Sequence, residues 1–150
     1  MTAPRDRIPP LDLLLGYGPA LLILVAGIGA YTLPERWQFA ALAVGSLWAG
    51  AILLFLAGVT RGLSFFTPDG PRPAQVVQSV WLFALGLGAF AMPGWVGLTL
   101  LTLGFASVGL FDPPAARAGL APAHFARLRP PQTAIAFVGL VLLLVRALHA

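Results

Sequence analysis

The stretch FAALAVGSLWAGAILLFLAGVT (residues 39–60) contains no charged side chain and ends immediately before Arg61. An apolar run of about 20 residues is long enough to cross the hydrocarbon core of a bilayer as one helix. Four more runs of this kind occur along the chain. We therefore predict an all-α, polytopic membrane helix bundle with short loops. The predicted spans, within a single membrane domain (1–150), are 12–31, 39–60, 75–92, 94–111 and 132–148.

The composition agrees with a membrane protein and limits its chemistry. Of 150 residues, 59% are hydrophobic and 9% are charged, which leaves little room beyond the five spans. Cysteine is absent, which excludes disulfides, iron–sulfur clusters, thiolate zinc sites and cysteine nucleophiles. Every basic residue besides histidine is arginine, a bias that suggests a bacterium with a GC-rich genome.

The start of the chain also resembles a signal peptide, because basic residues precede an apolar run. We expect a retained span instead, since the run is longer than usual and lacks a small-x-small cleavage site. Pro19 lies inside this span and cannot donate to the carbonyl of Leu15, so a kink is expected there. Proline-rich loops are predicted at 61–73 and 112–131.

The arginines are distributed unequally between the two sides of the predicted bundle. Arg36 and Arg146 share one side. The other side holds seven arginines: Arg5, Arg7, Arg61, Arg72, Arg117, Arg127 and Arg129. The positive-inside rule then predicts a cytoplasmic N-terminus in the bacterial inner membrane.

Small residues recur at four-residue spacing in the second span, at Ala41, Gly45 and Ala49. Gly58 and Gly62, further along the same helix, are two more candidate positions for helix packing. Such stripes let the backbone of another helix approach closely. Packing within the chain's own bundle is the simpler interpretation, and a dimer face is the alternative.

No aspartate, glutamate, arginine or histidine lies in the middle of a predicted span, so proton-coupled transport is not expected; six hydroxyl side chains remain there. We expect these hydroxyls to bond to their own helix backbone. They are Ser46, Thr60, Ser79, Thr99, Thr102 and Ser107.

His124 and His149 fall on opposite sides of the predicted membrane, so no metal site and no cofactor are expected. The dispersed arginines give no nucleic-acid patch.

The segment AHFARLR (residues 123–129) predicts a short amphipathic helix at the cytoplasmic surface. Phe125 and Leu128 would share one face, while His124 and Arg127 share another, with Arg129 nearby. Lipid anchoring is the first interpretation and docking to a partner protein the second.

The weakest alternative is an enzyme that acts on lipid. Only Asp112, His124 and Arg129 could serve it, and an acid and a base without a nucleophile or metal make a poor catalytic set. We therefore expect no catalytic residues.

Two motifs resemble a family of small bacterial and mitochondrial membrane proteins that includes transmembrane protein sixty-nine. In that family the second span ends Ile-Leu-x-Phe-Leu-Gly-Gly-x-His-Trp-Gly. The matching residues here are Ile52, Leu53, Phe55, Leu56, Gly58 and Gly62. Ala57 replaces a glycine, and Thr60 and Arg61 stand where His-Trp is usual.

The second motif reads Asp, a loop, then Pro-x-Trp-Tyr-x-x-Leu-Arg-x-x-x-Thr. It is matched by Asp112, Pro122, Leu128, Arg129 and Thr133. His124 and Phe125 occupy the places of the aromatic pair, and Gly18 with Pro19 resembles the family's start. The resemblance implies a bundle of about five helices in the bacterial inner membrane and no established activity.

Because the His-Trp pair is missing, we interpret Arg61 as a cytoplasmic anchor that pairs with Asp112 or Asp69. The function expected is an accessory or assembly subunit of a larger membrane complex. The alternative is a transporter or channel for a neutral or lipid-like solute. A continuous polar cavity would favour transport, and a tightly packed bundle would favour the accessory role.

Overall fold

The structure is a computed structural model that describes residues 10–92 and 94–149, so Arg5, Arg7 and Pro93 lie outside the described residues. The described part forms five helices and no strand. All five are long and apolar enough to cross a membrane, which confirms the predicted all-α bundle. They are α1 (Pro10–Thr32), α2 (Glu35–Ser64), α3 (Pro73–Ala91), α4 (Gly94–Arg117) and α5 (Phe125–Leu148).

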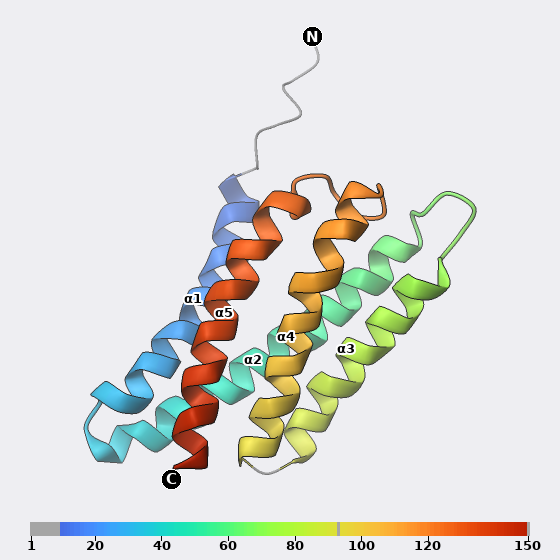
Figure 1. Ribbon diagram of the computed structural model, residues 1–150. Helices are drawn as coiled ribbons and strands as arrows, with labels where there is room; N and C mark the ends of the chain where they lie inside the picture. Colours follow the sequence, from blue (N-terminus) through green and yellow to red (C-terminus); the bar gives the residue numbers. More distant parts are fainter. Residues whose placement is uncertain (1–9, 93, 150) are drawn as a thin grey trace.

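The helices form a closed ring in the order α1, α5, α4, α3, α2, and each contacts the next. α2 also contacts α4 and α5, because it crosses the back of the bundle obliquely (Figure 1). As a result α1 and α2 meet at one end of the bundle and diverge toward the other (Figure 1). We call the end with the α2–α3 and α4–α5 connections the loop end, and the opposite end, with the C-terminus, the turn end.

The helices extend further than the apolar runs. α2 spans Glu35–Ser64 and not 39–60, α4 continues to Arg117 and not 111, and α5 begins at Phe125 and not 132. α3 ends at Ala91, one residue before the predicted end. The apolar run marks what lies in hydrocarbon, whereas hydrogen bonding continues a helix into the interface.

The prediction of loops throughout 61–73 and 112–131 was therefore wrong at the helix ends. Two proline pairs that suggested loops lie inside helices instead: Pro113 and Pro114 in α4, and Pro130 and Pro131 in α5. Each proline removes one backbone donor and leaves the carbonyl four residues earlier without its helical hydrogen bond, in the last turns of α4 and the first two turns of α5. Beside the second pair, the Thr133 hydroxyl donates to the carbonyl oxygens of Arg129 at 2.8 Å and Pro130 at 3.1 Å.

The interior is closely packed at its centre. Leu53, Val108 and Leu140 are fully buried. Between α1 and α5 the backbones themselves touch, since a methyl group at Gly27 would lie 2.7 Å from the carbonyl oxygen of Gly139. Glycine is required on both sides of this contact, because any side chain would force the helices apart.

The hydroxyls of the spans bond to their own helices, as predicted. All six donate to a backbone carbonyl three or four residues earlier, at 2.7–3.0 Å. They are Ser46, Thr60, Ser79, Thr99, Thr102 and Ser107. These hydroxyls are therefore satisfied without a ligand or another helix.

Candidate functional site

A layer of polar side chains joins four helices near the loop end. At its centre, the Arg129 guanidinium of α5 lies 3.2 Å from the Asp112 carboxylate of α4. Both side chains are mostly buried, with 13% and 14% of their surface exposed. Gln78 of α3 donates to the other oxygen of Asp112 at 2.9 Å. Three helices are thus tied together by one carboxylate.

The layer continues to α1 through the residues just before α5. The ring of Phe125 lies under the Arg129 guanidinium at 4.5 Å and meets His124 edge to face at 5.1 Å. His124 Nε2 is 3.0 Å from a carboxylate oxygen of Asp12 in the first turn of α1. A cation over an aromatic face is an attractive arrangement that also shields the charge from solvent.

A second polar group holds the connections at the same end. The buried Gln75 side chain exchanges hydrogen bonds with the Thr67 hydroxyl at 3.0–3.1 Å. Its amide oxygen also accepts from the backbone of Arg72 at 3.0 Å, and its nitrogen lies 3.5 Å from the carbonyl oxygen of Leu120. One glutamine therefore fixes both the α2–α3 and the α4–α5 connections.

Of the predicted interface residues, the structure brings together Asp112, His124, Phe125 and Arg129. Arg61 lies elsewhere, and its predicted ion pair with Asp112 or Asp69 is wrong. It donates to the Ser64 hydroxyl at 3.0 Å and stacks on Phe65 at 4.4 Å. Asp112 is engaged by Arg129 instead, because α4 and α5 are neighbours in the ring.

The predicted surface helix at 123–129 is also corrected. Residues from Phe125 onward form the first turns of α5 and not a separate amphipathic helix. The two faces were assigned correctly in part, since Leu128 is buried and Arg127 is exposed. His124 does not share the face of Arg127, because it turns to Asp12.

Several polar residues of this layer escaped sequence analysis: Asp12, Gln75, Gln78 and Gln132. Three of them could have been singled out from the sequence. Gln75, Gln78 and Gln132 are uncharged polar residues that interrupt otherwise apolar runs near the starts of α3 and α5. Glutamine can donate and accept at once, so it suits contacts between helices near the membrane surface.

The small residues of α2 divide into two groups. Ala49 is fully buried, and a methyl group at Gly45 would lie 2.8 Å from Leu143 of α5 and 2.9 Å from Ala26 of α1. Ala41 is partly buried against the same core. Gly58 and Gly62, in contrast, have no atom within 4 Å of where a side chain would begin.

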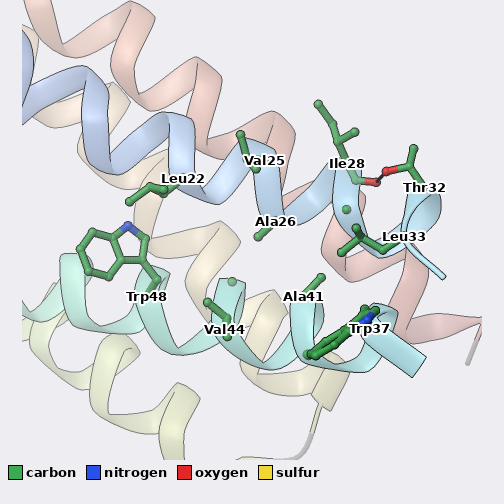
Figure 2. A pocket seen from close by; sticks show the side chains of 13 residues that line it. Leu22, Val25, Ala26, Ile28, Thr32, Leu33, Trp37, Ala41, Val44 and Trp48 are labelled. Atoms are coloured by element: carbon green, nitrogen blue, oxygen red, sulfur yellow. Dashed lines mark hydrogen bonds between the residues drawn. The ribbon is translucent and has the colours of Figure 1, made fainter. Parts of the chain in front are cut away.

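Two cavities follow the seam between α1 and α2. The larger, about 830 Å³, lies toward the turn end and is almost entirely apolar. Figure 2 shows it between α1 and α2, with Trp37 and Trp48 on the α2 side. Two of its polar side chains are engaged by the backbone: Thr32 donates to the Ile28 carbonyl, and Trp48 donates to the Pro19 carbonyl at 3.2 Å. This groove suits the acyl chains of surrounding lipid.

The second cavity, about 250 Å³, lies toward the loop end, where α1 and α2 diverge. α1, α2 and α5 form most of its wall, and Phe105 of α4 adds to it. Most of the lining is apolar. Its polar end is formed by Asp12, Arg129, Gln132 and Thr133.

Chemically, this arrangement connects the helices through paired polar side chains. In the polar layer the Arg129 guanidinium lies against the Asp112 carboxylate, and the His124 ring lies against the Asp12 carboxylate. Within the described residues, no group of three or more histidine, aspartate or glutamate side chains could hold a metal ion. No family model matches the chain, and neither a curated protein nor a solved structure matches it.

Proposed function

We propose that this protein is a small accessory or assembly subunit that packs against a larger complex in the bacterial inner membrane, and that it is not an enzyme. The single observation behind the proposal is the open small-residue face of α2. Gly58 and Gly62 lie one turn apart, and a side chain added at either would meet no other helix of the chain within 4 Å, so a partner helix can approach the backbone there.

The rest of the α2 stripe supports this assignment by contrast. Gly45 and Ala49 are covered by the chain's own helices, so their small size is already explained by internal packing. Gly58 lies on the same exposed face as Ala51 and Phe55, and no internal contact accounts for a glycine at its position. A partner outside the chain would account for it.

The packing of the bundle favours the accessory role over the alternative of a transporter. Passage of a solute needs a continuous path lined by polar groups. The polar layer lies at the loop end, whereas the centre is filled by Leu53, Val108 and Leu140, each fully buried. The arginine-only composition supports a bacterial source, and the arginine asymmetry supports a loop end in the cytoplasm.

The test is extraction of the tagged protein from its native membrane in mild detergent, with mass spectrometry of what co-purifies in stoichiometric amount. Gly58→Ile and Gly62→Ile should lose the partner while the chain itself is still extracted in normal yield. Ala84→Ile, at an exposed position on α3, is the matched control and should retain it. Recovery of free monomer only from wild type, or of the same complex from Gly58→Ile, would contradict the proposal.

A further inference from the structure

The cavity at the loop end contains a buried polar group that has no partner in the protein. Gln132 is 5% exposed, and its Nε2 atom makes no hydrogen bond. The amide lies against the backbone of α1 at Gly16, where any side chain would overlap it. A buried donor without an acceptor costs about 1–3 kcal/mol, so its presence here calls for an acceptor in the cavity.

The acceptor that fits is uncharged. Arg129 is already paired with Asp112, and Asp12 places a second carboxylate at the same end of the cavity, so a negatively charged group is disfavoured there. Of the buried nitrogens in this region that make no hydrogen bond, Arg129 Nε and His124 Nε2 each lie beside a carboxylate, whereas Gln132 Nε2 is a neutral donor with no ionic partner. A carbonyl oxygen satisfies such a donor without the cost of bringing a further charge into a buried place.

The depth of Gln132 points to a lipid ester. It follows Arg129 by three residues on α5, so it lies about 4.5 Å further from the loop end along the helix. Arg127, which is exposed, and the ion pairs therefore occupy the level of the headgroups, with Gln132 just below them. Ester carbonyls lie between the headgroups and the hydrocarbon core.

The remaining cavity wall is suited to an acyl chain. Below Gln132 it is lined by apolar residues, among them Ala20, Ile52, Leu56 and Ala136. Leu15 of α1 and Phe55 of α2 also line it and are 62% and 66% exposed, so the cavity opens to lipid between these two helices. Its volume of about 250 Å³ accommodates part of a lipid while the rest stays in the bilayer.

We propose that the cavity between α1, α2 and α5 binds one acyl chain of a membrane glycerolipid, whose ester carbonyl accepts a hydrogen bond from Gln132 Nε2. This lipid site does not rest on the partner proposed for the Gly58 face, because it is argued from Gln132 and the cavity, although Phe55 borders both. It also explains why the sequence keeps a glutamine at a buried position otherwise surrounded by apolar side chains.

The test compares two phosphatidylcholines that differ only in their linkage. The purified full-length protein is exchanged into an equal mixture of ester-linked and ether-linked lipid with identical chains, and the lipids retained are counted by native mass spectrometry. Wild type should retain the ester lipid about fivefold over the ether lipid, as expected for one hydrogen bond to a buried neutral donor. Gln132→Leu should bring that ratio close to one.

Two further variants keep the test decisive. Ala134→Leu, two residues away at an exposed position of α5, should keep the wild-type ratio. Ile52→Trp fills the apolar wall while leaving the amide in place, and should reduce retention of both lipids. Equal retention of the two lipids by wild type, or an ester preference that persists in Gln132→Leu, would overturn the proposal. So would a Gln132→Leu variant that loses thermal stability in ether-linked and ester-linked lipid alike without any change in the lipid ratio.

Discussion

The indole nitrogen of Trp48 donates a hydrogen bond of 3.2 Å to the carbonyl oxygen of Pro19, joining α2 to α1. Trp48 lines the large apolar groove, and Pro19 lines the smaller cavity near the polar layer. The bond therefore marks the boundary between two spaces of different character along one helix seam.

Replacing Trp48 by phenylalanine should weaken this seam. The ring volume is partly retained while the donor is lost, and hydrogen bonds between membrane helices contribute about 0.6 kcal/mol on average, with a maximum of about 1.7 kcal/mol. A small but measurable fall in thermal stability in detergent is expected. Trp95→Phe, a half-exposed tryptophan at the start of α4, is the control and should change the midpoint less.

Removing Arg129 should be much more costly, because it leaves the buried carboxylate of Asp112 without its cation. Loss of one partner of a buried pair costs about 3–5 kcal/mol, so Arg129→Met should be strongly destabilised. Arg127→Met, two residues away and exposed, should be close to neutral. Adding Asp112→Asn to Arg129→Met should restore most of the stability. If both single arginine variants unfold at the same temperature, the pair is not structurally important.

The contact between Gly27 and Gly139 predicts strong sensitivity to one methyl group. Gly139→Ala would place that group 2.7 Å from the backbone of Ile23, and such overpacking costs about 1–3 kcal/mol. Gly18→Ala meets nothing within 4 Å and should be neutral or stabilise the helix by up to about 1 kcal/mol. The comparison is made by thermal unfolding in the same detergent. Equal effects of the two substitutions would mean that α1 and α5 are not in backbone contact.

The orientation can be tested directly, because the chain contains no cysteine. Asp69→Cys in the α2–α3 connection should be protected from a membrane-impermeant thiol reagent in intact spheroplasts and should react after lysis. Glu35→Cys, at the α1–α2 turn, should react in both. This pattern follows from the arginine excess at the loop end, and the reverse pattern would place that end outside the cytoplasm.

The number and type of the helices could be predicted from the sequence, because each span must satisfy its own backbone and so requires a long apolar run. The hydroxyl contacts could be predicted for the same reason, since they are local. The residues at which the helices begin and end were harder to predict from the sequence. Pro113 and Pro130 suggested loops, but both lie close enough to a terminus for the helix to absorb them.

The partners of the charged residues could not be derived from the sequence, because they depend on which helices become neighbours. Arg61 and Asp112 belong to the same end of the bundle, yet the Asp112 carboxylate is paired with Arg129, which lies on the adjacent helix α5. The same limit applies to Gln132. Its lack of a partner is a property of three helices at once and leaves no local signature in the sequence.

The length of α2 links the protein to the thickness of its membrane. Thirty residues extend for about 45 Å, well beyond a hydrocarbon core of about 30 Å, so the helix must tilt or protrude. A thinner bilayer favours greater tilt to reduce hydrophobic mismatch. Since α2 diverges from α1 and forms one wall of the smaller cavity, we expect a change of tilt in a thinner bilayer to change the width of that cavity.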